Sequence, residues 1–314
     1  MQFPSLKYVT IPYCNTSLDF LSPARAPALE HLEIEEFIAE HTDFPPVAAL
    51  KTLNLDSYGS PLFPYLIPTQ ALTKLSISGE LSPLPNSIHF PSLKMLEISC
   101  LAKARQFVDA IMAPNLERLK YTSFGPDGSP SVALRGSRSK FTSVRHLIFH
   151  GTTLLYADAI ALCEAFPGVR RVESMTNELP HFFDPEVGNA RAHHPINLWT
   201  ELESSTLRGL HPKWLEPKQL SAWLFDRQAL GLRKLHLKLE RLSEFNGPSR
   251  YAEFEFSQLY EVLKENCILE LVCFPLTLPK MYLYKPVNSR LRVVSTSFPC
   301  AGLCSLYVFS ICRT

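Results

Sequence analysis

A nine-residue pattern occurs twice in this chain almost unchanged. Residues 90–98 read FPSLKMLEI and residues 3–11 read FPSLKYVTI, so five consecutive residues are identical. An internal match of this kind predicts a repeat architecture, which constrains the fold more strongly than any single local pattern. Reduced to its apolar residues, the pattern is Leu-x-x-Leu-x-Ile after a turn residue.

The pattern recurs at a nearly constant interval. Its first apolar residue stands at positions 6, 29, 50, 72, 93 and 116, which gives steps of 23, 21, 22, 21 and 23 residues. Leucine-rich repeats have periods of about 20–29 residues, with one strand and one return segment in each. Looser copies begin at Val144, Val169 and Leu202. A further copy is Leu232, Leu235 and Leu237. A weak final copy is Ile268 and Leu271.

We therefore expect an α/β fold, a curved leucine-rich-repeat solenoid with parallel strands on its concave side. The return segments are expected to be irregular or short-helical and to lie on the convex side. A solenoid of this length needs no division into globules, because each repeat contacts only its neighbours. We assign residues 1–286 to the solenoid, with regular units over 3–124 and irregular units over 141–275, and residues 287–314 to a separate C-terminal tail.

Four return segments show the three- and four-residue apolar spacing of a helix. These stripes are Phe107 to Ile111, Ala159 to Phe166, Leu220 to Leu224 and Phe256 to Leu263. Two insertions, at 125–140 and 175–197, are expected to be a solvated linker and a long loop. Trp199 and Trp223 are expected in the core, and Trp214 is left open.

Charge and cysteine content narrow the classes of function. The formal charge of +1 is too small for bulk attraction to nucleic acid or to an anionic membrane, so we expect neither as a partner. The eight cysteines include no Cys-x-x-Cys pair, which argues against structural zinc and favours reduced thiols. Without a charged and apolar leader, the expected compartment is the cytoplasm or the nucleus.

The sequence offers little support for an enzyme. It contains no glycine-rich phosphate loop, no His-Glu-x-x-His and no nucleophile elbow, so no catalytic residue and no cofactor is expected. The best metal candidates share one predicted loop with irregular spacing, and we interpret them as exposed loop residues: His181, Asp184, Glu186, His193 and His194.

The strands suggest a binding surface instead. Successive side chains of a strand face opposite ways, so residues between the inward leucines point out over the concave face. The polar members of this set change from acidic to basic along the chain. They are His31, Glu33, Glu35, Asn54, Asp56, Lys74, Glu97, Arg118, Lys120, His146, His150, Arg171, Lys234, His236 and Lys238. We expect this surface to orient a protein partner of opposite charge order.

The repeated segments carry a family resemblance. FPSLKMLEI, APALEHLEI, APNLERLKY and FPGVRRVES resemble the leucine-rich regions of F-box proteins from mushroom-forming fungi, over about residues 3–240. The resemblance implies a substrate receptor for a cullin–RING ubiquitin ligase. In that family an N-terminal F-box binds the Skp adaptor, and the repeats hold the target without catalysing its modification.

No F-box stands before Phe3, and no polar unit covers the first repeat. We therefore expect a chain truncated at its N-terminus, with the Skp adaptor and cullin as partners only if an F-box precedes it. The alternative is a free-standing scaffold unrelated to ubiquitin. An enzyme regulator like the Ran GTPase-activating repeat proteins is a third interpretation, which the irregular repeats disfavour.

Overall fold

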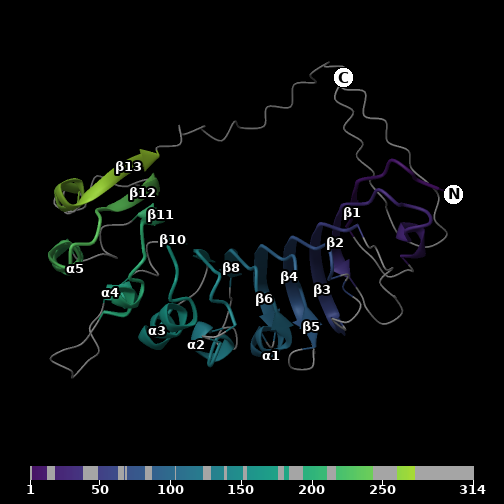
Figure 1. Cartoon of the computed structure of the whole chain (residues 1–314), viewed down its shortest axis with the longest axis horizontal. Coiled ribbons are helices and arrows are strands. Elements are labelled where there is room, and N and C mark those ends of the chain that lie inside the picture. Colours follow the sequence, from purple (N-terminus) through teal and green to yellow (C-terminus); the bar gives the residue numbers. More distant parts are fainter. Residues whose placement is uncertain are drawn as a thin grey trace, which may run out of the picture.

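The computed structural model describes most of the chain up to residue 272. The described residues are 2–12, 18–37, 49–62, 67, 69–81, 87–102, 104–122, 129–137, 140–150, 154–175, 180–183, 194–210, 217–242 and 260–272. They form a curved α/β structure, with strands along the inner side of an arc and helices along its outer side (Figure 1). The predicted tail at 287–314 and Trp214 lie outside these ranges.

One parallel sheet of eleven strands runs through the whole arc. Its strands, in chain order, are β1 (Tyr8–Ile11), β2 (His31–Phe37), β3 (Thr52–Leu62), β4 (Lys74–Leu81), β6 (Met95–Ala102), β8 (Arg118–Thr122), β9 (His146–His150), β10 (Arg171–Met175), β11 (Ser204–Leu210), β12 (Leu235–Leu242) and β13 (Cys267–Val272). A separate parallel pair joins β5 (Ile88–His89) to β7 (Ile111–Met112). Because each strand pairs with the next strand of the main sheet, every turn of the chain adds one strand and one return segment. The α/β class and the parallel sheet are thus confirmed, and the curved sheet is compatible with a solenoid.

Helices form where the return segments carry apolar stripes. They are α1 (Ala104–Ala110), α2 (Pro130–Ala133), α3 (Tyr156–Ala165), α4 (Pro180–Phe183) and α5 (Pro217–Ala229), and residues 260–266 are also helical. Two single 3₁₀ turns add to them, η1 (Asp19–Leu21) and η6 (Pro195–Leu198). The predicted helices at Phe107, Ala159 and Leu220 are confirmed, and of the last stripe only Tyr260 and Leu263 lie within the described residues.

The repeated leucines form continuous buried columns. The ladder places Leu32, Leu53, Leu75, Leu96, Leu119 and Leu147 side by side on successive strands. All six are at most 1% exposed. Burying one leucine side chain contributes about 1.5–3 kcal/mol. These columns are therefore the main source of cohesion between neighbouring turns.

The predicted alignment of the last two units is wrong. The ladder pairs Ser205 with Leu237 and Leu207 with Leu239, so Leu237 and Leu239 occupy the columns, two residues later than expected. A run of alternating leucines at 235, 237 and 239 fits the template in two registers, and only the neighbouring strand selects one. In β13, Ile268 is 59% exposed and Cys267 is buried instead, because alternation brings the odd-numbered residues inward.

Both predicted insertions contain buried structure. Within 125–140, α2 buries Pro130 and Ala133, so this segment is more than a solvated linker. Ser129 Oγ and the backbone N–H of Ser131 both donate to Asp158 Oδ1 on α3, at 2.5 and 2.8 Å. These bonds tie the two return segments together.

The second insertion, within 175–197, contains α4 and η6. Phe182 stacks between Phe149 and Trp199, with ring centroids 5.4 and 5.3 Å apart. Trp199 and Trp223 are 2% and 3% exposed, which confirms that both belong to the core.

Side chains in the turns bond each unit to the one before it. Asn115 Nδ2 donates to the Pro91 carbonyl at 2.7 Å, and Ser143 Oγ donates to the Pro114 carbonyl. Thr73 Oγ1 donates to the Lys51 carbonyl at 3.0 Å. These bonds add side-chain links between successive units to the backbone ladder. No described helix is both long and apolar enough to cross a membrane.

Candidate functional site

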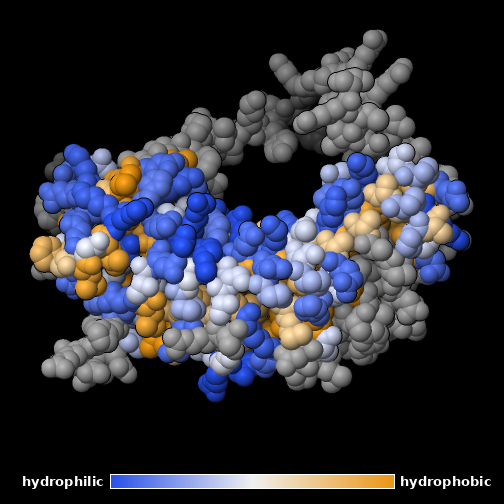
Figure 2. All heavy atoms as spheres, in the orientation of Figure 1, coloured by the Kyte–Doolittle hydropathy of each residue, from blue (hydrophilic) through white to orange (hydrophobic). Residues whose placement is uncertain are grey.

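The concave face of the sheet carries nearly all of the predicted binding residues. It consists of the strand residues that alternate with the buried columns, and Figure 2 shows hydrophilic residues along this inner surface. Half-buried positions are His31, Glu33, Asn54, Asp56, Glu97, Arg118, Lys120, His146, His150 and Lys238; exposed positions are Glu35, Lys74, Arg171 and His236. The strands bring all of these side chains onto one surface.

Lys234 is the exception. It precedes β12, and its Nζ donates to the backbone carbonyl of Glu265 at 2.9 Å. The prediction placed it on the concave face because the unit was read two residues too early. Its amine instead bonds the end of the helix at 260–266, which leads into β13.

Carboxylates near the first strands accept bonds from neutral groups. Asn54 Nδ2 donates to Glu33 Oε1 at 2.6 Å, and Thr10 Oγ1 approaches Glu33 Oε2 at 3.4 Å. Ser78 Oγ donates to Asp56 Oδ1 at 2.7 Å. Amide and hydroxyl donors leave the negative charge uncompensated, so this end of the concave face is acidic.

Glu173 is the centre of an ion-pair network on the middle strands. Its carboxylate lies 2.8 Å from His146 Nε2, 3.0 Å from Arg208 Nη2 and 3.8 Å from Arg118 Nη2. The hydrogen bond to His146 lowers the pKa of Glu173 most. Burial opposes this shift, while the charges of His146, Arg208 and Arg118 add to it. The Glu173 side chain is 17% exposed, so water screens these attractions only in part.

The network continues toward the last strands. Arg208 Nε lies 3.0 Å from Glu240 Oε2, Lys238 Nζ lies 2.8 Å from Glu240 Oε1, and His236 Nε2 lies 3.4 Å from Glu270 Oε2. On the other side, Lys120 pairs with Glu97. Charges from distant parts of the sequence thus neutralise one another across adjacent strands.

This pairing reduces the predicted change from acidic to basic. At the concave positions described on β2–β6, four carboxylates stand against Lys74, a net charge of −3. On β8–β13, five Lys and Arg residues stand against Glu173, Glu240 and Glu270, a net charge of +2 with neutral histidines. The concave face therefore changes from acidic to basic along the chain, as predicted. The change in net charge is smaller than the predicted binding residues alone suggest, because Glu173, Glu240 and Glu270 were not among them.

One apolar side chain lies within the charged network. Ile148 is flanked in register by Lys120 and Glu173, and it is only 3% exposed. Nearby, burial is the main cause that lowers the pKa of His150, and the charges of Arg208 and Lys120 lower this pKa further. His150 is therefore neutral at physiological pH.

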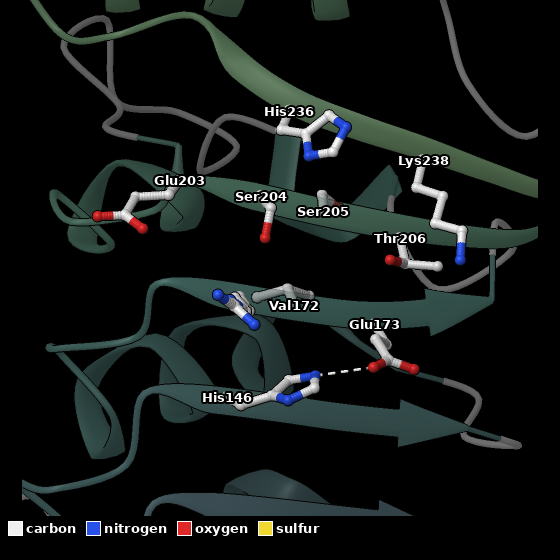
Figure 3. Close-up of a pocket in the computed structure, with 10 residues that line it drawn as sticks. His146, Val172, Glu173, Glu203, Ser204, Ser205, Thr206, His236 and Lys238 are labelled. Carbon is white, nitrogen blue, oxygen red and sulfur yellow. Dashed lines mark ion pairs between the residues drawn. The ribbon is translucent and has the colours of Figure 1, made fainter. Parts of the chain in front are cut away.

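A hollow opens on the concave face over β9–β12 (Figure 3). Its volume is about 470 Å³. Its wall consists of His146, Arg171, Val172, Glu173, Glu203, Ser204, Ser205, Thr206, His236 and Lys238. Figure 3 shows His146, Glu173, Ser204, Thr206, His236 and Lys238 around this space, on four adjacent strands.

Sequence reasoning missed several members of this surface. Ser204, Thr206 and Arg208 are the alternating residues of β11, while Glu240 and Glu270 follow the same rule on β12 and β13. The alternation of inward and outward side chains predicts all five of them. It was not applied to the unit at Leu202, and it was not extended to the ends of the last two units. The partners of Arg208 would still have been hidden, since Glu173 is 35 residues away.

The described residues hold no group of three or more His, Cys, Asp or Glu side chains that could bind a metal ion. Of the loop candidates, Asp184, Glu186 and His193 lie outside the described residues. His194 Nδ1 bonds to the Phe183 carbonyl.

The described thiols, Cys163 and Cys267, are buried and free. Burial raises the pKa of both, to about 11 for Cys267, so neither is a reactive nucleophile at neutral pH.

The structure defines an α/β protein with a curved parallel sheet and a polar concave face. Comparisons with protein-family models, curated proteins and solved structures found no match.

Proposed function

We propose that this chain is a protein-interaction module of the leucine-rich-repeat class, and that its concave face binds a protein partner. The observation that carries this proposal is the concave face itself: polar side chains from ten consecutive strands share one accessible surface. Repeated leucines in one register support the repeat class. The resemblance to F-box receptors makes target recognition for a cullin–RING ubiquitin ligase the favoured role.

Charge variants on the concave face test the binding proposal. The tagged chain would be used to capture partners from its own cells, with quantification by mass spectrometry. Lys120→Glu and Lys238→Glu each place a carboxylate against an existing one, Glu97 or Glu240, and change the local charge by two units. We expect both variants to recover less of the partner than the wild type does. Glu164→Lys, at an exposed position of α3, is the control on the convex side.

A paired swap separates binding from folding. In Glu97→Lys with Lys120→Glu the ion pair and the net charge are kept, and only the charge order along the face is reversed. We expect wild-type stability and weakened capture. Unchanged capture by the swap and by both single variants would reject the concave face as the binding surface.

The same experiment, run with the chain as given and again with any exon upstream of Met1 restored, separates the two roles, because the Skp adaptor is expected to bind only through an F-box. If the Skp adaptor and a cullin are recovered together with the target, the chain acts in a ubiquitin ligase. If a stable partner is recovered without them, the chain is a scaffold outside ubiquitin transfer.

A further inference from the structure

Hydrogen-bond donors stand in one row across five adjacent strands of the concave face. The ladder places Arg118 beside His146, His146 beside Arg171, Arg171 beside Ser204, and Ser204 beside His236. We call these five residues the donor row. Parallel strands are about 4.8 Å apart, so the row extends over about 19 Å, which is long enough to contact several residues of an extended peptide.

The carboxylates of this region lie mainly to one side of the row. Glu173 is two residues further along its strand than Arg171, Glu240 is four residues beyond His236, and Glu270 is two beyond Ile268. Glu173 and Glu270 pair with members of the row, whereas Glu240 pairs with Arg208 and Lys238, which also lie beyond it. A ligand over the donor row contacts N–H and O–H groups first.

Arg171 is the arginine of the row that has no side-chain partner in the described part of the chain. Arg118 and His146 pair with Glu173, and His236 pairs with Glu270. Neither Arg171 nor Ser204 has a side-chain partner among the described residues, and Arg171 is exposed at the edge of the hollow. A planar guanidinium beside a hydroxyl and an imidazole can bind a carboxylate through two parallel N–H bonds and further donors.

The charge balance of the hollow decides between a carboxylate and a phosphoryl group. Its wall holds two permanent cations, Arg171 and Lys238, and two carboxylates, Glu173 and Glu203. Lys238 is engaged by Glu240 at 2.8 Å. Glu173 is paired with Arg208 and Glu203 lies 4.0 Å from Arg170, so Arg171 is the cation of the wall left without a carboxylate among the described residues, and a dianionic phosphoryl group would keep one uncompensated charge. A carboxylate carries the single negative charge that Arg171 neutralises.

We propose that the donor row binds an extended segment of a protein partner through one carboxylate of that segment. Arg171 receives this carboxylate, and Ser204 and His236 are further donors to the same segment. The inference rests on the proposed function, since it names the chemistry of the partner on the same concave face.

Selection from a phage-displayed library of short random peptides tests the proposal without a known partner. Peptides that bind the wild-type chain are expected to share one position enriched in Asp or Glu. A synthetic peptide with the selected sequence would then be measured by fluorescence polarisation. We expect Arg171→Glu to weaken its binding about tenfold or more, because a charge-assisted pair is replaced by repulsion. Arg135→Glu, at an exposed position in the turn after α2, has the same charge change and should bind normally.

Two peptide variants make the test specific. Replacing the acidic residue by Lys should abolish binding to the wild type and restore it to Arg171→Glu, which a folding defect could not produce. Replacing it by phosphoserine should weaken binding. Tighter binding of the phosphoserine peptide, or the absence of an acidic position among the selected peptides, would overturn the proposal.

Failure of this inference and of the proposed function are distinguishable. Peptides that lose affinity for Lys120→Glu but keep it for Arg171→Glu would overturn the role of the donor row and leave concave-face binding standing. A folded chain that selects no peptide would count against both.

Discussion

Glu173 shows how one residue organises the concave face. Two arginines and a histidine, from β8, β9 and β11, converge on its carboxylate, and no other carboxylate among the described residues pairs with so many. Without that carboxylate, Arg118, His146 and Arg208 would lose the acceptor that they share. Glu173 therefore links the basic side chains of β8, β9 and β11 at the wall of the hollow.

Glu173→Gln is expected to reduce stability at neutral pH by about 2 kcal/mol, the typical contribution of hydrogen bonds to a charged group. The pKa of Glu173 is lowered in the folded state, so its stabilisation is present above the ordinary value of 4.5 and is lost as the pH falls below it. Urea unfolding of the two proteins should therefore differ at pH 7 and converge as the pH falls through the lowered folded-state pKa of Glu173.

Glu117→Gln is the matched control, because the Glu117 side chain is 62% exposed and pairs with Lys94 at 3.3 Å. Exposed pairs of this kind contribute little, so less than about 0.5 kcal/mol should be lost. If Glu173→Gln is as stable as the wild type at pH 7, the ion pairs of Glu173 do not stabilise the fold.

At the scale of elements, Asp158 connects α3 to α2 through hydrogen bonds that no sequence pattern predicted. Asp158 is 1% exposed. It accepts the Ser129 hydroxyl and the backbone N–H groups of Ser131 and Leu155. Burial alone would raise the pKa of Asp158, but these hydrogen bonds outweigh it and lower the pKa. One carboxylate thus caps α3 and anchors α2.

We expect Asp158→Ala to destabilise the protein by about 2 kcal/mol, because it removes a cap of α3 and the partly buried hydrogen bonds to Ser129 and Ser131. Asp158→Asn keeps an acceptor oxygen and should lose less. Glu164→Ala, at an exposed position of the same helix, should change the unfolding midpoint little. Equal midpoints for Asp158→Ala and the wild type would show that α2 is not anchored here.

The sequence predicted those parts of the fold that depend on local spacing. Leu53, Leu75 and Leu96 could be assigned to buried columns because strand alternation and a constant repeat interval are visible in the chain itself. The register of β12 could not, since its alternating leucines fit two alignments equally well. The partners of Arg208 and Asp158 could not either, because they come from other repeats and only folding brings them together.

At the scale of the whole molecule, the columns predict how the arc unfolds. Leu96 stands between Leu75 and Leu119 and is fully buried, so Leu96→Asp places an unpaired charge inside the sheet at a cost of about 4 kcal/mol or more. We expect loss of the cooperative thermal transition. Met95→Asp, one residue away, introduces the same group on the concave face between Lys74 and Arg118 and should be tolerated. A folded Leu96→Asp protein would show that the columns are misassigned.

The curvature of the sheet gives the two sides of the arc different roles. The convex side consists of helices and turns whose buried faces complete the core, and the concave side presents charged and hydroxyl side chains to the solvent. Partner binding on the concave face is therefore the central claim for the whole molecule.

Site-specific photo-crosslinking tests this claim most directly. A photoreactive amino acid would replace Thr206, at the wall of the hollow, or Glu164, at an exposed position of α3 on the convex side. Both proteins would be expressed in the chain's own cells and irradiated. The account predicts a discrete protein adduct from position 206 and none from position 164. An adduct from position 164 alone would contradict it and place the partner on the outer side of the arc.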